Sequence, residues 1–214
     1  MNVQNIIDEL ASYGFEDIPD AEKVRIINDV IADVCSREPW PFLQQEVTNA
    51  TVDAAGKVGN IADLGAILFI VDTTTGMKLR WLRWDEFTER FALQLTMAGD
   101  PYLYFFKGDD LYVYPIDTTP TLRIGYVKTP ATVVQADAES AIAIPARHHW
   151  MIIEGALVKL FAIDDDAENV QVHKLSFDER LQTMRQDMWK QQYDTTDTIK
   201  VFEDDWNDES NGFF

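Results

Sequence analysis

Residues 99–128 read GDPYLYFFKGDDLYVYPIDTTPTLRIGYVK, and this stretch decides the fold class. Its aromatic and β-branched residues fall into three runs, which predict strands over 102–106, 111–114 and 122–126. The residues between the first two runs, Lys107-Gly108-Asp109-Asp110, are typical of a tight hairpin, because glycine readily takes positive φ. We therefore expect β structure, with no recognisable catalytic group, at the centre of the chain.

Helical patterns lie on both sides of this β stretch. Apolar residues recur at helical spacing over 3–13 and over 24–34, and we expect Asp20 to cap the second of these helices. That helix must end before Pro39, because the proline ring disfavours helical geometry at the preceding residue. After the β stretch, 150–163 is apolar nearly all round and predicts a buried helix. The last helix is expected to follow Asp164-Asp165-Asp166 and to run to about Tyr193.

The region between the helical pairs predicts further short elements. Strands are expected over 46–52, 66–72 and 78–84, with turn residues at 53–56. Asp85 is expected to cap a short helix over 86–95. Several short antiparallel strands with one helix indicate a small sandwich or open barrel.

Together these elements predict an α+β fold in which a helical bundle is interrupted by an inserted antiparallel β subdomain. The expected parts are an N-terminal helical pair (1–38), the β-rich insertion with one short helix (39–145), a C-terminal helical pair that completes the bundle (146–194) and an extended C-terminal arm (195–214).

Charge and cysteine content limit the functions that the chain can have. The sequence holds 18 Lys and Arg against 37 Asp and Glu, which gives a net charge of −19. This charge repels nucleic acid phosphates and anionic lipid, and it fits either simple solubility or a surface that lies near DNA without binding it. The only cysteine, Cys35, is expected in the core, so no disulfide framework exists and a reducing compartment fits. We expect neither a secretory signal nor a membrane span.

Catalytic and cofactor motifs are not evident. His148 and His149 lack the spacing that would place two imidazoles on one metal ion, and Glu154 is out of phase with both. The acidic runs 164–166 and 203–205 lack the glycine and the ligand spacing of a calcium-binding loop. The sequence therefore predicts no enzyme, no cofactor and no metal site. Paired carboxylates of the kind used in glycoside hydrolysis have no fixed spacing in sequence, so this alternative stays open.

The arm differs in kind from the rest of the chain. Residues 195–214 contain six acidic residues against one basic residue, a net charge of −5. They also contain four aromatic residues, namely Phe202, Trp206, Phe213 and Phe214. Ordering 20 such residues alone costs more than burying four aromatic rings returns. The arm is therefore either a frayed end or a tether whose aromatic anchors are captured by a partner.

The succession of short motifs resembles the adaptor, or head-to-tail connector, proteins of tailed bacteriophages. Over residues 1–190 the motifs are the end of the helical pair at Arg37-Glu38-Pro39-Trp40-Pro41-Phe42-Leu43, then Leu79-Arg80-Trp81-Leu82, Asp85-Glu86-Phe87, Gly99-Asp100-Pro101 with Tyr104, Leu111-Tyr112-Val113-Tyr114-Pro115, Tyr126 and Ile144-Pro145.

This resemblance implies a structural virion protein that forms a dodecameric ring beneath the portal, in the neck between head and tail. It implies assembly in the host cytoplasm, and partners that include the portal, other copies of the chain and downstream tail or nozzle proteins. DNA passes through such a ring without specific binding, and the C-terminal arm docks on the portal. The resemblance carries no catalytic residues and no membrane contact.

Two functions of other classes remain open from the sequence. A carbohydrate-binding or carbohydrate-cleaving module would use an aromatic platform on the β strands, formed by Trp40, Trp81, Trp84, Tyr104, Tyr112 and Tyr114. An acidic mimic of DNA would instead present carboxylates along one face to a basic host protein.

Overall fold

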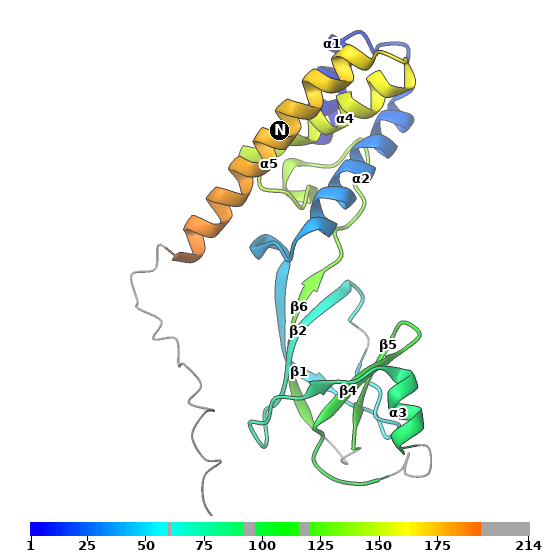
Figure 1. The fold of residues 1–214 in the computed structure, drawn as a ribbon, viewed down its shortest axis with the longest axis vertical. Helices are drawn as coiled ribbons and strands as arrows, with labels where there is room; N and C mark the ends of the chain where they lie inside the picture. Colours follow the sequence, from blue (N-terminus) through cyan, green and yellow to red (C-terminus); the bar gives the residue numbers. More distant parts are fainter. Residues whose placement is uncertain (60, 92–96, 116–119, 194–214) are drawn as a thin grey trace, which may run out of the picture.

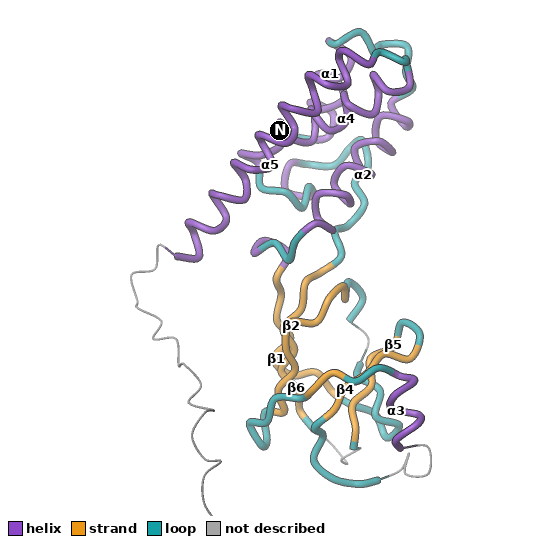
Figure 2. The backbone as a smooth tube through the Cα atoms, viewed as in Figure 1, coloured by secondary structure: helices purple, strands orange, loops and turns teal. Residues whose placement is uncertain are grey.

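Four helices form a bundle, and a three-stranded ribbon leads from this bundle into a small barrel (Figures 1 and 2). The computed structural model describes residues 1–59, 61–91, 97–115 and 120–193. The first two helices and the last two lie in the same bundle although the whole β region separates them in sequence. The predicted α+β class, with a bundle interrupted by a β insertion, is therefore confirmed.

The bundle comprises α1 (Val3–Ser12), α2 (Asp20–Arg37), α4 (His149–Ile163) and α5 (Ala167–Tyr193). Helix α4 lies at its centre, in contact with the other three helices. This position follows from its sequence, because a helix that is apolar nearly all round must be buried on most sides. On α5, the side chains of Phe177, Leu181, Met184 and Met188 are all buried in this core.

The helix ends follow local chemistry, with one correction. Helix α1 begins with a capping box in which the Asn5 amide donates to the Asn2 side chain at 2.8 Å. Helix α2 begins at Asp20 itself, after Pro19, so the prediction that Asp20 is the cap was wrong by one residue. The Asp20 carboxylate instead lies in the first turn, 3.7 Å from the Nζ atom of Lys23, where a negative charge favours the helix dipole.

The strands form two three-stranded sheets. The first contains β1 (Gln44–Thr51), β6 (Thr121–Lys128) and β2 (Leu64–Asp72), in that spatial order. The second contains β3 (Arg80–Trp81), β4 (Leu103–Lys107) and β5 (Asp110–Tyr114). Helix α3 (Trp84–Phe91) packs against β4, and three short 3₁₀ turns connect the remaining parts, namely η1 (Pro41–Leu43), η2 (Glu139–Ala141) and η3 (Ala146–His148).

Backbone hydrogen bonds outside the named strands close the two sheets into a barrel. On one side Leu79 donates to the carbonyl of Ile70 on β2, and the same segment continues into β3, which pairs with β4. On the other side Val58 donates to Leu111 on β5, while Gly59 donates to Thr51 on β1. In the barrel, the edges of the described strands are therefore paired, and such pairing protects against edge-to-edge association.

Two apolar clusters account for the stability of this barrel. Its interior is filled by small and branched residues from all sides, namely Ala50, Val58, Ile70, Leu79, Leu111, Val113, Leu122 and Ile124. Outside, α3 covers β4 and β5 with stacked rings. Phe87 lies 4.2 Å from Phe105 between ring centroids and 5.0 Å from Tyr114, so the alternate residues of the hairpin serve two different cores.

Several strand predictions need correction. The hairpin of β4 and β5 is confirmed, but the third strand of the opening stretch, β6, leaves it and lies between β1 and β2. Strands β1 and β2 therefore do not pair with each other. The strand expected over 78–84 is only Arg80–Trp81 and is parallel to β4, whereas all other strand pairs are antiparallel. The register is set by long-range pairing, which no local pattern contains.

The short helix also differs from its prediction. It begins at Trp84, so Asp85 lies in its first turn rather than at its cap, and Phe87 is buried. The predicted end of this helix, at Leu95, lies outside the described residues.

Candidate interaction surfaces

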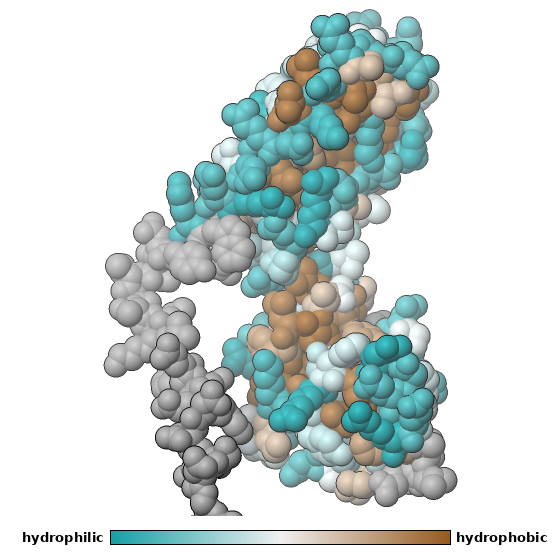
Figure 3. Space-filling view, in the orientation of Figure 1, coloured by the Kyte–Doolittle hydropathy of each residue, from teal (hydrophilic) through white to brown (hydrophobic). Residues whose placement is uncertain are grey.

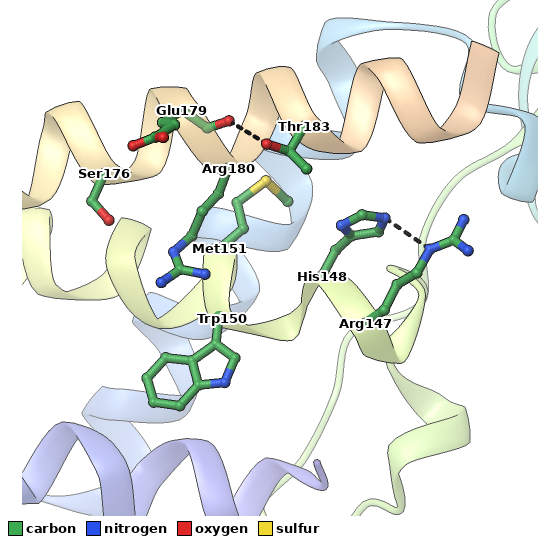
Figure 4. Close-up of a pocket in the computed structure, with 8 residues that line it drawn as sticks. All are labelled: Arg147, His148, Trp150, Met151, Ser176, Glu179, Arg180 and Thr183. Carbon is green, nitrogen blue, oxygen red and sulfur yellow. Dashed lines mark hydrogen bonds between the residues drawn. The ribbon is translucent and has the colours of Figure 1, made fainter. Parts of the chain in front are cut away.

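A pocket of about 310 Å³ lies between the start of α4 and the middle of α5 (Figure 4). Its lining mixes apolar and polar groups, namely Arg147, His148, Trp150, Met151, Ser176, Glu179, Arg180 and Thr183. The aromatic wall is Trp150, whose ring lies 5.8 Å from the guanidinium carbon of Arg180. Such a cation–π pair presents a flat apolar surface beside a hydrogen-bond donor.

The basic end of this pocket is held by a small charged network. The Nε atom of Arg147 donates to His148 Nε2 at 3.0 Å, and the Asp187 carboxylate lies 3.6 Å from the same imidazole nitrogen. Burial and the neighbouring Arg147 charge lower the pKa of His148, so that its ring is a neutral acceptor near pH 7.

A second polar cluster is buried between α4 and α5. Glu154, which projects from the otherwise apolar α4, lies 2.8 Å from Nδ1 of His173 and 3.5 Å from Nε of Arg180. The His173 ring stacks on Phe161 and meets the edge of Tyr13, so three helices converge on it. Sequence reasoning missed His173, because nothing in its local sequence marks its distance to Glu154.

The histidines considered from the sequence as metal ligands have other partners. His149 is buried, and its two ring nitrogens lie 3.0 Å and 2.8 Å from the carbonyl oxygens of Met1 and Ile144. Asp166 caps α5 and accepts from the Asn169 amide, which lowers the pKa of its carboxyl. Among the described residues, no three His, Cys, Asp or Glu side chains come together as a metal site would require.

The six aromatic residues suggested as a sugar platform do not share one surface. Trp40 and Tyr114 are each 1% exposed and belong to different cores, in the bundle and beneath α3 respectively. Tyr112 is partly buried and stacks on Phe105, whereas Trp81 is 58% exposed. A flat carbohydrate-binding surface needs several neighbouring exposed rings. This arrangement counts against the carbohydrate reading.

The amino-acid sequence of the chain matches a family of known proteins. Residues 1–200 match the family described as SU10 adaptor protein, which is most of the 214-residue chain. The chain belongs to the SU10 adaptor family. The resemblance seen in the sequence motifs is thereby confirmed. No curated protein matches the chain.

Membership makes this SU10 adaptor a structural protein of a bacteriophage particle, and the family is not enzymatic. It also associates the chain with the portal and tail, and with the neck of the virion. In the described part of the adaptor, no helix is long and apolar enough to cross a membrane.

The anchors predicted for portal docking occupy the end of this adaptor. Phe202, Trp206, Phe213 and Phe214 lie outside the described residues, which end at Tyr193. Helix α5 leads directly to that arm, and in Figure 1 its C-terminal turns extend beyond the other helices of the bundle. The 27 residues of α5 span about 40 Å at 1.5 Å per residue.

Apolar side chains gather on the visible surface of the ribbon between bundle and barrel, as they also do on part of the bundle of this adaptor (Figure 3). Within the ribbon, a bidentate pair joins Arg123 on β6 to Glu46 on β1 at 2.7 and 2.9 Å. The ring of Phe69 on β2 covers Gly125, where any side chain would collide with it. These contacts fix the three strands to one another on the outer face.

Proposed function

We propose that the chain forms an adaptor ring that joins the phage portal to the tail and continues the DNA channel, with its C-terminal arm docked on the portal. The observation that carries this proposal is the family match over residues 1–200 in a chain whose longest helix leads into an acidic, aromatic arm. The ring of twelve copies and the downstream tail or nozzle proteins belong to the same proposal, as does assembly in the host cytoplasm.

The arm suits capture by another protein better than packing on its own. Its four aromatic residues supply apolar anchors, while its net charge of −5 keeps it soluble before capture. Helix α5 offers these anchors from the end of a rigid element. In this proposal Phe202, Trp206, Phe213 and Phe214 fill pockets on the portal, and the ordering entropy is paid when docking occurs.

The charge of the chain fits a channel that DNA traverses without binding. At −19 for each copy, a ring presents DNA with a wall of like charge, so phosphate contacts do not hold the DNA back. The same charge opposes self-assembly. We therefore expect free subunits to remain monomeric at low salt and to form a ring once the portal supplies additional contacts.

Truncation after Tyr193 tests the proposal. The shortened chain retains all four bundle helices and the barrel, so its thermal unfolding should match that of the full chain. Its co-sedimentation with portal particles should be lost. A matched variant, Phe213→Ala with Phe214→Ala, keeps the length and charge of the arm and should weaken attachment through the anchors alone. Attachment that is unchanged by truncation would remove the arm from this function, and stable rings of free protein at low salt would refute the need for a template.

A further inference from the structure

The upper half of β2 presents an open strand edge. Strand β2 pairs with β6 along one side, and its other side pairs with residues 77–79 only from Ile70 onward. Within the described chain, no strand pairs with that second side between Leu64 and Phe69. The barrel closes its lower edges. Among the described strands, the upper part of β1 also lacks a partner on its second side, but that strand is polar and carries Glu46.

The composition of this edge is that of an interface rather than of a protected edge. From Leu64 to Val71 the strand reads LGAILFIV, without a charge or a proline. Leu68 is 41% exposed, and Gly65 and Ala66 are exposed as well. Long, uncharged edge strands pair with other chains unless lysine, proline or a covering element prevents it. A partner strand is therefore expected here.

For copies that point the same way, as in a ring, the width of the bundle argues against the ribbon of a second copy as that partner. Pairing one ribbon directly with the next would place neighbouring copies three strands apart, which is about 14 Å at a strand spacing near 4.8 Å. Each copy carries a bundle at least two helices wide, and a helix with its side chains is roughly 10 Å across. The bundles would collide. A single extended segment from another copy adds one strand without bringing the bundles together.

The irregular shape of this edge also favours a single segment, rather than a folded sheet, as the partner. The pairing of β2 with β6 shifts between Leu64 and Ala66 and again between Ile67 and Phe69. Such bulges increase the local twist of a strand. A segment that is not already part of a sheet can follow this twist, whereas the edge of a folded sheet cannot.

The arm contains one segment with the pattern of such a strand. Residues 196–202 read TDTIKVF, in which β-branched and aromatic residues dominate and the apolar Ile199 and Val201 alternate with Thr198 and Lys200. Alternation of this kind is typical of a strand with one buried face. In such a strand Phe202 would lie on the face opposite Ile199 and Val201, and the acidic cluster and the other three aromatic anchors follow it. The strand backbone and the four anchors can therefore serve different partners.

We propose that residues 196–202 of one copy add as a strand to the open edge of β2, from Leu64 to Phe69, on a neighbouring copy. In Figure 1 α5 ends to the left of the ribbon, on the side of β1, whereas the upper end of β2 lies at the right margin. The chain's own arm therefore begins on the side of the ribbon away from this edge, which favours the arm of a neighbouring copy as the partner. The inference relies on the proposed ring only for the presence of that neighbour.

Disulfide formation between two single variants tests the exchange in the full-length protein. Ala66→Cys places a thiol on the open edge, and Thr198→Cys places one on the arm segment. The native Cys35 does not compete, because it is buried and burial raises its pKa to about 11. The two variants, carrying different tags, are mixed, oxidised with and without portal particles, and separated by mass under non-reducing conditions.

We expect the mixed disulfide to exceed a control pair by about tenfold, because strand addition raises the effective concentration of the two thiols. The control pairs Thr198→Cys with Leu175→Cys, which is 66% exposed on the far bundle helix. Adding Ile199→Pro to the arm variant should reduce the mixed disulfide to the control value, since proline removes a backbone donor. Asn211→Pro, beyond the segment, should leave it unchanged.

The two readouts separate this inference from the proposed function. Co-sedimentation with portal reports attachment, and the mixed disulfide reports strand exchange. Attachment with only control amounts of mixed disulfide would overturn the exchange and leave the adaptor function standing. A mixed disulfide without attachment would support the exchange and refute portal docking. A double variant of one chain that gives only an intrachain bond would also overturn the assignment to a neighbour.

Discussion

Gly155 lies where the packing of the bundle leaves too little space for an added methyl group, so Gly155→Ala should destabilise the protein. This glycine lies inside α4, where α2 and α5 both approach the helix. A Cβ atom built on it would lie 2.7 Å from Cγ1 of Val30 and 3.0 Å from Cε2 of Phe177. Both neighbours are themselves buried, at 2% and 8% exposure, so neither side chain can turn toward solvent.

The expected change in the free energy of unfolding is a difference between two opposing effects. Carbon atoms prefer separations near 3.5–4.0 Å, so the new methyl group is too close by about 1 Å. Overpacking of this kind costs roughly 1–3 kcal/mol. Replacing a helical glycine by alanine returns about 1 kcal/mol through helix propensity. We therefore expect Gly155→Ala to destabilise the chain by about 1 kcal/mol, which is approximately a 2–4 °C fall in Tm at this size.

The double variant Gly155→Ala with Val30→Ala distinguishes this reasoning from a general effect on α4. Removing the Val30 methyl groups leaves space for the new Cβ, so the cost of the two changes together should be smaller than the sum of their separate costs by about 1 kcal/mol. Denaturant unfolding of the four proteins, at a constant m-value, measures this coupling. A Gly155→Ala variant as stable as the parent, or an additive double variant, would refute the packing argument.

Three further predictions concern the junction, the cysteine and the pocket. Trp40→Phe should lower the free energy of unfolding by about 2–3 kcal/mol, because the buried indole donates to the Val34 carbonyl at 2.7 Å and its removal leaves both a void and an unpaired acceptor. Chemical unfolding measures this change, and a loss below about 0.5 kcal/mol would contradict it. Cys35 should react with a thiol reagent only slowly in the folded chain and rapidly in denaturant, since burial raises its pKa to about 11; equal rates would place the thiol at the surface. Folding lowers the pKa of His148, so the unfolded chain takes up a proton at higher pH than the folded chain does. The free energy of unfolding should therefore fall as the pH drops from 7 through the ordinary histidine pKa near 6.5. His148→Gln should flatten this pH dependence, and an unchanged slope would show that His148 is not its cause.

The parts of the fold that depend on neighbouring residues could be predicted from the sequence. Helical spacing gave the four bundle helices, and Gly108 with its flanking strands gave the β4–β5 hairpin. The insertion of β6 between β1 and β2 could not be predicted in this way, because it joins residues at least 50 positions apart. The strand expected over 78–84 was also too long, because only Arg80–Trp81 is a strand. Leu79 and Leu82 face two different cores, and both residues between them, Arg80 and Trp81, are left exposed.

The same distinction holds for the candidate surfaces. The charged arm and its anchors are recognisable from composition alone, since an acidic segment with few aliphatic residues has no core of its own. The pocket beside Trp150 depends on α4 and α5 lying side by side, and the Glu154–His173 pair lies within the same contact. Neither feature has a sequence motif, because the residues that form it share no fixed spacing.

The ribbon explains how an adaptor can hold its two ends in a fixed relation without a large interface between them. Strand β6 belongs to both cores: Val127 packs in the bundle, whereas Leu122 and Ile124 of the same strand pack in the barrel. The orientation of the barrel is thus transmitted through a continuous hydrogen-bonded strand rather than through a loop. Because Arg123, Glu46 and Phe69 brace this strand on both sides, bending the ribbon requires breaking contacts across all three strands at once. An arm strand added at β2 would make the ribbon four strands wide, so occupancy by a neighbour would stiffen the connection as the ring forms.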